Sequence, residues 1–138
     1  MPTILCIDDD RKTLEVQRAV LEQNGYTVLS SEDGSAGIQL AAEQPVDLVI
    51  LDFKMPGMDG GEVAAVLLQD HPDLPIVIRS GFLDSIPEWL RWCAIANLEK
   101  GDGPDKMLHA IEGLIGKNKI MSSQPAEATA GKSKRRVA

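Results

Sequence analysis

The sequence has few cysteines and no long apolar run, and each shortage excludes a class of protein. Cys6, inside the first apolar run, and Cys93, after a short helical segment, are the two cysteines among 138 residues. Two thiols so placed cannot form a disulfide framework, and we expect them to be reduced and buried. No run approaches the roughly 20 apolar residues of a membrane span, and the N-terminus shows no signal-peptide pattern. The sequence therefore predicts a soluble, cytoplasmic protein that does not associate with a membrane.

Basic residues are also scarce over most of the chain. Residues 1–116 hold 8 Lys and Arg against 20 Asp and Glu, which argues against nucleic-acid binding by this part itself. Residues 117–138 reverse the ratio, with 6 basic residues against 1 acidic residue. This segment has small and polar residues and no apolar periodicity, so we expect a disordered basic C-terminal tail. Its KSKRR end has two interpretations: a contact with nucleic acid or an acidic partner, and the more common solubilising role.

The remaining composition and pattern favour one α/β domain. At 43% hydrophobic residues, the chain can bury a hydrophobic core that needs no disulfide or structural metal to stabilise it. Short apolar runs predict strands at 4–7, 27–31, 48–51, 76–78 and 95–99, and helical spacing or capping signals predict helices at 11–24, 34–43, 60–70, 85–93 and 104–116. Strict alternation with short loops predicts a (βα)₅ domain whose five-stranded parallel sheet is covered by helices on both faces.

Four of the predicted strands run into polar residues that phosphoryl chemistry uses. Asp8, Asp9 and Asp10 follow the first strand, Asp52 follows the third, and Ser80 and Lys100 follow the fourth and fifth. The carboxyl ends of parallel strands meet at one edge of such a sheet, and ligands bind in the crevice there. The set would thus place several carboxylates, a hydroxyl and an ammonium together, which suits a divalent cation and a phosphoryl group.

In this order and spacing, the segments resemble the response-regulator receiver domain, the phospho-acceptor part of two-component signalling. The resemblance covers residues 3–116 and includes Asp8-Asp9, the stretch 52–60, Ser80-Gly81 and Lys100. It implies a flavodoxin-like, doubly wound sheet with strand order 2-1-3-4-5. It also implies a receiver domain over residues 1–116 that is no enzyme in the usual sense, since it would catalyse only its own phosphoryl transfer and autodephosphorylation.

The acidic cluster is expected to hold Mg²⁺. Two carboxylates about 4 Å apart repel by about 4 kcal/mol at an effective dielectric near 20, so the cluster requires a cation or a proton. Mg²⁺ takes oxygen ligands and is usually held by one or two carboxylates and phosphate oxygens. We expect Asp9 and Asp52 as direct ligands, the backbone carbonyl of Lys54 as a third, and Asp8 through a water molecule. Asp10 is expected only to cap the helix that follows.

Asp52 is the predicted phospho-acceptor. A carboxylate can take a phosphoryl group as an acyl phosphate, here from a histidine kinase or a phosphotransfer protein. Lys100 would neutralise a phosphoryl oxygen and Ser80 would donate a hydrogen bond to another, acting as the switch residue. Lys54 and Phe82 flank the path of the hydrolytic water, so we expect them to set the lifetime. Phe82 cannot orient water, which predicts a phosphorylated state of many minutes or longer.

Two departures from the family concern how the signal leaves the domain. Gly101 stands where the family usually has a proline after Lys100, and Asn97 stands where it often has an aromatic switch residue. Trp89 and Trp92 lie at positions i and i+3 of the short fourth helix, and interfaces favour tryptophan. We therefore expect the output surface to include Trp89, Trp92 and Asn97.

Three functions could use parts of this residue pattern. No output domain follows in the sequence, which predicts a stand-alone response regulator that signals by contact with a downstream protein, either in a relay or on a target. A phosphorylation-independent interaction module would have a degenerate site, and the intact residue set argues against it. An aspartate-nucleophile phosphatase would use Asp8 and Asp10 two apart, but it would leave Asp52 and Lys100 less well explained.

Overall fold

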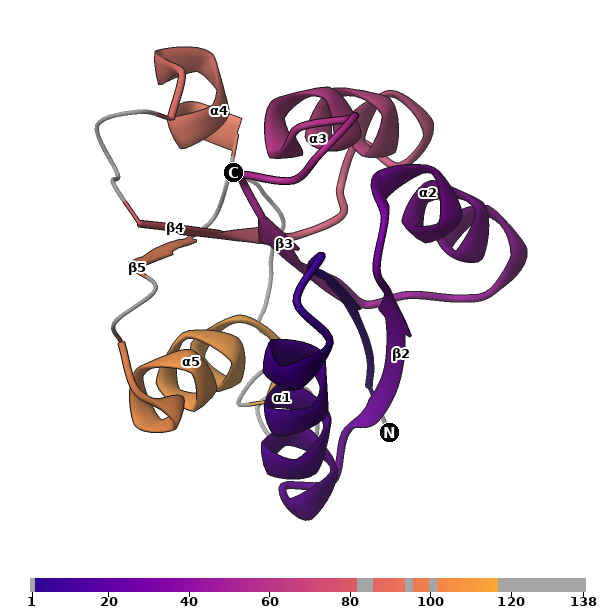
Figure 1. The fold of residues 1–138 in the computed structure, drawn as a ribbon. Helices are drawn as coiled ribbons and strands as arrows, with labels where there is room; N and C mark the ends of the chain where they lie inside the picture. The colour runs from indigo at the N-terminus through magenta and orange to yellow at the C-terminus, as the bar shows by residue number, and fades with distance from the viewer. Residues whose placement is uncertain (1, 82–85, 94–95, 100–101, 117–138) are drawn as a thin grey trace, which may run out of the picture.

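The computed structural model describes residues 2–81, 86–93, 96–99 and 102–116, and in this part of the chain five strands alternate with helices (Figure 1). The elements are β1 (Thr3–Ile7), α1 (Arg11–Gln23), β2 (Thr27–Ser31), α2 (Gly34–Glu43), β3 (Leu48–Asp52), α3 (Gly60–Asp70), β4 (Ile76–Ser80), α4 (Glu88–Cys93), β5 (Ala96–Glu99) and α5 (Pro104–Ile111), followed by a π-helical turn (Glu112–Gly116). The predicted (βα)₅ alternation is confirmed.

All four strand pairs are parallel, and the strand order is β2-β1-β3-β4-β5. The order implied by the resemblance is therefore confirmed. In the register, Ile7 pairs with Leu51 and Asp52 pairs with Arg79, so β1, β3 and β4 end at nearly the same level. Residues that follow these three strands are thereby brought to one edge of the sheet.

Two cores cover the two faces of the sheet, because successive strand residues point to opposite sides. Leu5, Val49 and Ile78 belong to the core under α2, α3 and α4. Ile4 and Ile50, one residue along from two of these, belong to the core under α1 and α5. Figure 1 shows the same division, with α1 and α5 on one side of the sheet and the other three helices opposite.

The N-terminus of α3 lies directly against the end of β3. The amide of Gly60 donates a 2.7 Å hydrogen bond to the carbonyl of Phe53. A Cβ atom at Gly60 would lie 2.6 Å from the Cα of Phe53 and 2.9 Å from the carbonyl oxygen of Asp52, so this approach requires glycine. Asp59 and Glu62 form a capping box that fixes the start of the helix.

The end of the last helix and the start of α4 differ from the predicted positions. The last helix changes to a π turn after Ile111, where a single α-helix to Gly116 was predicted, and α4 begins at Glu88 after Pro87. Cys6 is buried, as predicted. None of the described helices has the length and the apolar composition that a membrane span needs. The predicted disordered tail, residues 117–138, lies outside the described residues.

Candidate functional site

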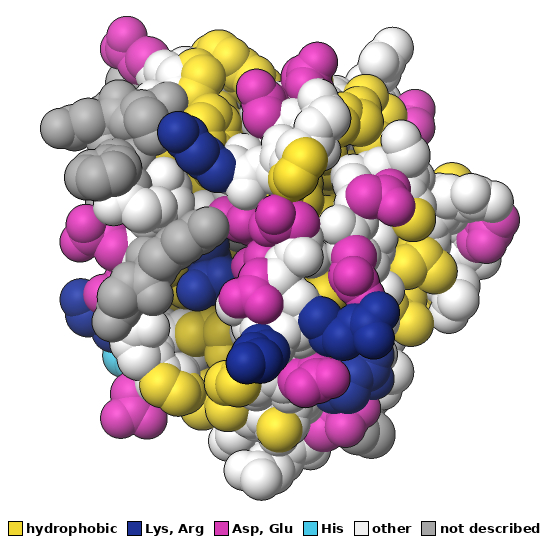
Figure 2. Space-filling model, in the orientation of Figure 1, with side chains coloured by type: hydrophobic (Ala, Val, Ile, Leu, Met, Phe, Trp, Pro, Cys, Tyr) yellow, Lys and Arg dark blue, Asp and Glu magenta, His cyan; other side chains and the backbone are white. Residues whose placement is uncertain are grey.

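Three carboxylates gather where β1 and β3 end. Oxygen atoms of Asp8, Asp9 and Asp52 lie within 4.8 Å of one another. Asp8 is 3% exposed and Asp52 is 1% exposed, whereas Asp9 is exposed. Figure 2 shows acidic side chains gathered in the middle of this face of the molecule, above the ends of the central strands. The prediction that these three carboxylates lie close together is confirmed.

Asp8 is held in place by main-chain and side-chain contacts. Its amide donates a 3.1 Å hydrogen bond to the carbonyl of Ser31 on the neighbouring strand. Its Oδ1 accepts a 2.9 Å hydrogen bond from the amide of Asp10, and its Oδ2 accepts a 3.0 Å hydrogen bond from Nη1 of Arg79. These contacts fix the buried carboxylate at the edge of the sheet.

Arg79 is a residue of the site that the sequence reasoning missed. Its side chain is 14% exposed and forms an ion pair with Asp8, whose side chain is 4% exposed. The cation expected to balance the cluster is therefore supplied in part by the chain itself, through a guanidinium that was not predicted. The signal in the sequence was a charged residue inside the run IVIRS. Strand alternation places it on the face of Val77, one residue before Ser80.

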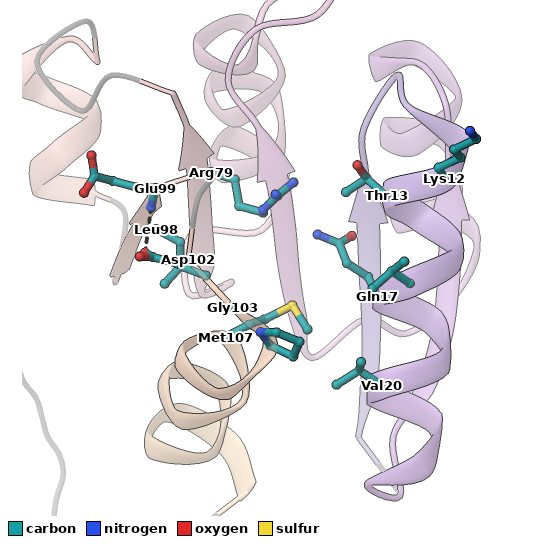
Figure 3. Close-up of a pocket in the computed structure, with 12 residues that line it drawn as sticks. Lys12, Thr13, Gln17, Val20, Arg79, Leu98, Glu99, Asp102, Gly103 and Met107 are labelled. Carbon is teal, nitrogen blue, oxygen red and sulfur yellow. Dashed lines mark hydrogen bonds between the residues drawn. The ribbon is translucent and has the colours of Figure 1, made fainter.

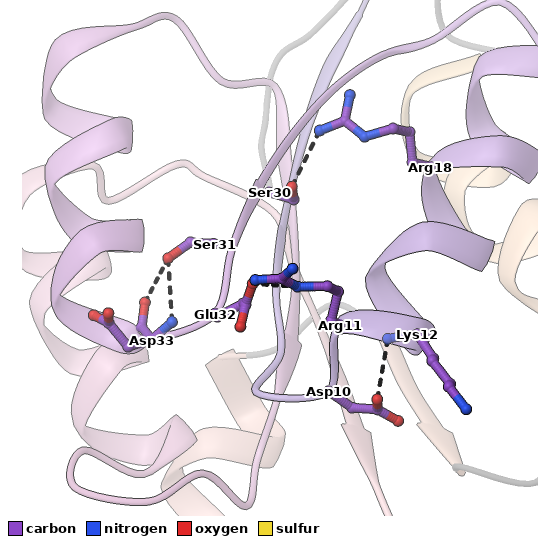
Figure 4. Close-up of polar contacts among 8 residues, drawn as sticks. All are labelled: Asp10, Arg11, Lys12, Arg18, Ser30, Ser31, Glu32 and Asp33. Carbon is purple, nitrogen blue, oxygen red and sulfur yellow. Dashed lines mark hydrogen bonds and ion pairs between the residues drawn. The ribbon is translucent and has the colours of Figure 1, made fainter.

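Asp10 acts as the N-cap of α1, as predicted. Its Oδ1 accepts a 3.1 Å hydrogen bond from the amide of Lys12 (Figure 4). Its Oδ2 accepts a 2.9 Å hydrogen bond from the hydroxyl of Thr13. The hydrogen bond from Thr13 is the main cause that lowers the pKa of Asp10. Its side chain is thus used in capping, and it is not a member of the metal-competent cluster found among the described residues.

The loop after β2 is also fixed by polar contacts beside the site. Arg11 forms a 2.9 Å ion pair with Glu32, and the hydroxyl of Ser31 donates a 2.7 Å hydrogen bond to the carbonyl of Asp33 (Figure 4). The Asp33 carboxylate in turn accepts a hydrogen bond from the amide of Ala36 and caps α2. Because Asp8 is bonded to the Ser31 carbonyl, this network supports the acidic cluster from the β2 side.

The other predicted site residues divide into described and undescribed ones. Ser80 is 1% exposed at the end of β4, the strand next to Asp52, and the side chain of Lys54 is exposed. Trp89 is 45% exposed on α4, which leaves it available on the surface. Lys100 and Phe82 lie outside the described residues, and for Trp92 and Asn97 only the backbone elements are described.

The cluster fits a hard divalent cation. Three carboxylates with oxygens within 4.8 Å of one another provide the oxygen ligands that Mg²⁺ prefers. The guanidinium of Arg79 balances part of the charge at Asp8, but it reaches the cluster from the α1 and α5 side of the sheet. All three carboxylates thus lie close enough together to serve one cation.

Comparisons with known proteins agree with this geometry. The family model described as "Response regulator receiver domain" matches residues 4–112. The chain is 31% identical over 135 residues to the response regulator MprA of Mycobacterium ulcerans, covering 92% of this chain and 56% of that protein. It is 39% identical over 98 residues to MprA of Mycolicibacterium vanbaalenii, covering 71% of this chain and 40% of that protein. The chain thus spans about half the length of these curated relatives.

Solved structures show the same fold over most of the chain. A response regulator receiver domain from Clostridium thermocellum matches with a TM-score of 0.79 and 26% identity, covering 88% of this chain and 99% of that one. The response regulator TrrA of Thermotoga maritima, solved with Mg²⁺-BeF, matches with a TM-score of 0.78 and 27% identity, covering 83% of this chain and all of that one. From its fold, its acidic cluster and these relatives, the chain belongs to the response regulator receiver domain family.

Proposed function

We propose that this receiver domain accepts a phosphoryl group on Asp52, with Mg²⁺, from a sensor histidine kinase or a histidine phosphotransfer protein. The observation that carries the proposal is the position of Asp52, which is 1% exposed, ends β3 and has its oxygens within 4.8 Å of those of Asp8 and Asp9. Buried carboxylates gathered at the carboxyl ends of parallel strands are typical of functional sites.

The transfer requires one bond to form and one to break. A carboxylate oxygen of Asp52 attacks phosphorus while the bond to the donor's histidine nitrogen, or to the carboxyl oxygen of acetyl phosphate, breaks. The leaving group keeps the bonding electrons, and the product is an acyl phosphate. Ser80 would donate a hydrogen bond to one phosphoryl oxygen and Lys100 would place its ammonium by another, which supplies the positioning and charge that this chemistry needs.

Asp9, Asp52 and the carbonyl of Lys54 are the groups that would hold Mg²⁺, with Asp8 acting through a water molecule. When bound, the ion supplies positive charge against the carboxylates and the incoming phosphoryl oxygens. Asp8 keeps its place through Arg79 and the Ser31 carbonyl, so its carboxylate is already oriented toward the cluster. TrrA, with 27% identity and Mg²⁺-BeF in its structure, supports this assignment by likeness.

The signal would leave the domain by protein–protein contact. Trp89 is the described member of the proposed output surface, and a surface tryptophan is favoured in interfaces. Two expectations stay predictions: that the regulator is stand-alone, since the matched relatives are about twice as long, and that it is cytoplasmic. The intact mass of the natural protein tests the first of these, with 14.9 kDa expected.

Phosphoryl uptake from acetyl phosphate tests the proposed function. The wild-type chain should gain one phosphoryl mass with Mg²⁺ and none with EDTA, and Asp52→Asn should gain none. Glu15→Gln is a matched control, because Glu15 is an exposed acid on α1 that is not a member of the cluster. Sustained turnover of p-nitrophenyl phosphate would instead support the phosphatase reading, which the capping role of Asp10 disfavours.

A further inference from the structure

Arg79 places a positive charge at the candidate site, and the proposed phosphoryl transfer does not use it. Its Nη1 donates a 3.0 Å hydrogen bond to the Oδ2 of Asp8, and the two side chains are 14% and 4% exposed. Water and salt screen a buried ion pair much less than one on the surface. The charge of Arg79 therefore acts strongly on any ion that binds to the neighbouring carboxylates.

The side chain of Arg79 extends over the strand that carries Asp52. The strand order is β1-β3-β4, and Asp52 pairs with Arg79 in the register. Asp8 follows β1, so the guanidinium passes the end of β3 to reach it. Figure 3 shows this side chain extending from β4 in the direction of α1. The guanidinium thus lies next to the cluster that is proposed to hold a second cation, Mg²⁺.

Arg79 contributes charge to Asp8 more than orientation. The amide of Asp8 donates a hydrogen bond to the Ser31 carbonyl, and its Oδ1 accepts a 2.9 Å hydrogen bond from the amide of Asp10. These two contacts hold the carboxylate in place without Arg79. The guanidinium adds a full positive charge, which neutral amide and carbonyl groups do not. Removing it would therefore make the cluster more negative while Asp8 keeps its orientation.

We propose that Arg79 is an internal counter-cation that competes with Mg²⁺ for the acidic cluster and keeps its affinity for Mg²⁺ low. In the metal-free chain, the guanidinium balances charge on the buried carboxylate of Asp8. Two cations at one carboxylate repel each other, so the metal binds more weakly than it would to the carboxylates alone. Phosphorylation would then need a higher Mg²⁺ concentration. This inference rests on the proposed function, because it concerns the same metal site.

A cleft gives the guanidinium room to move away from Asp8. The cleft has a volume of about 260 Å³, lies between α1 and α5, and is lined by Arg79 together with Gln17 and Met107 (Figure 3). A side chain enclosed in a close-packed core could not leave its partner without displacing its neighbours. Arg79 borders open space instead, so its ion pair can open while the sheet stays in place.

Titration of the ¹⁵N-labelled full chain with Mg²⁺, followed by NMR at constant ionic strength, tests the proposal. Arg79→Gln removes the charge but keeps a hydrogen-bond donor, and it should bind Mg²⁺ about tenfold more tightly than wild type. Arg18→Gln is the matched control, because it removes a guanidinium that pairs with Glu22 on α1. Its Kd for Mg²⁺ should stay within about twofold of wild type.

Two further measurements separate a counter-cation from a merely structural residue. In wild type, the Arg79 Nε–H signal should shift with the same Mg²⁺ midpoint as the amide of Asp9. In EDTA, Arg79→Gln should lower the urea midpoint, and adding Asp8→Asn should restore much of the loss, because Asp8 then no longer carries the charge that Arg79 balances. If Arg79→Gln does not fold without metal, the Nε–H signal of wild type still decides.

Equal or weaker Mg²⁺ binding by Arg79→Gln would overturn the proposal, and so would an Arg79 Nε–H signal that does not respond to Mg²⁺. If wild type binds Mg²⁺ and Arg79→Gln binds it no more tightly, this inference is wrong and the proposed function stands. If neither protein binds Mg²⁺, the proposed function fails together with the inference.

Discussion

Among single residues, the most informative contact is the 3.0 Å ion pair between Arg79 and Asp8. Residue types at strand ends made it possible to predict from the sequence that Asp8, Asp9 and Asp52 converge. The pairing of Asp8 with Arg79 could not be predicted in this way. The sequence does not show which residue a charged side chain inside an apolar run will contact. Only the register, which sets Asp52 beside Arg79, brings that guanidinium to the cluster.

The buried thiol of Cys6 predicts a dependence of stability on alkaline pH. Burial raises the pKa of Cys6 from its ordinary value of 9.0 to about 12. Above pH 9 the thiol ionises in the unfolded chain but keeps its proton in the folded one, so the free energy of unfolding falls as pH rises. The loss should approach about 1.4 kcal/mol per pH unit between pH 9 and 12.

Urea denaturation of wild type and Cys6→Ala across this pH range checks the effect. The Ala variant should be less stable at neutral pH, since it leaves a cavity, but its stability should fall less steeply above pH 9. Parallel curves for the two proteins would show that Cys6 ionises normally in the folded state.

At the scale of elements, the contact of α3 with the end of β3 determines where Asp52 lies. Gly60→Ala would place a Cβ atom 2.6 Å from the backbone of Phe53. We expect a loss of about 1–3 kcal/mol in the free energy of unfolding, as for other overpacked sites, together with slower phosphorylation. Denaturant melts measure the first effect and acetyl phosphate uptake the second.

Gly113→Ala is the matched control for this prediction, because a Cβ atom there meets nothing within 4 Å. It should leave both stability and phosphorylation nearly unchanged. Equal stability of Gly60→Ala and wild type would mean that α3 can move away from β3 without cost, and that Gly60 does not position Asp52.

The fluorescence of Trp89, on α4, should change when the domain takes up a phosphoryl mimic. A Cβ atom at Gly61 would lie 3.9 Å from the ring of Trp89, so the ring lies close to the N-terminus of α3. The preceding residue, Gly60, approaches the backbone of Asp52. In a Trp92→Phe background, beryllofluoride with Mg²⁺ should change the tryptophan emission, and Ser80→Ala should reduce that change. Emission that stays constant on addition of beryllofluoride would place the output surface elsewhere.

Most elements were predictable because periodicity and capping residues are local signals. Helices α2 and α3 begin and end as predicted, since Asp33 and Asp59 cap them just before glycine. The π turn after Ile111 was not predicted, because nothing in the pattern of EGLIG separates it from a continued α-helix. The cleft between α1 and α5 was also missed, since it depends on how two helices pack, which their separate sequences do not specify.

For the whole molecule, the proposed metal site predicts a link between Mg²⁺ and stability. A cation that binds the folded chain and not the unfolded one raises the free energy of unfolding by about 1.4 kcal/mol for each tenfold excess over its Kd. Thermal melts across millimolar Mg²⁺ should therefore shift upward in wild type. Asp9→Ala should remove the shift, whereas Glu15→Gln should retain it; a flat melting temperature in wild type would count against the site.

We propose that the ends of β1, β3 and β4 form one centre that directs a phosphoryl group to Asp52. Borohydride reduction of the phosphorylated chain converts an aspartyl phosphate to homoserine, and peptide mass spectrometry then locates it. We expect homoserine at position 52 alone, only after treatment with acetyl phosphate and Mg²⁺. Homoserine at position 8, where the rival phosphatase reading puts the nucleophile, or at no position, would contradict it.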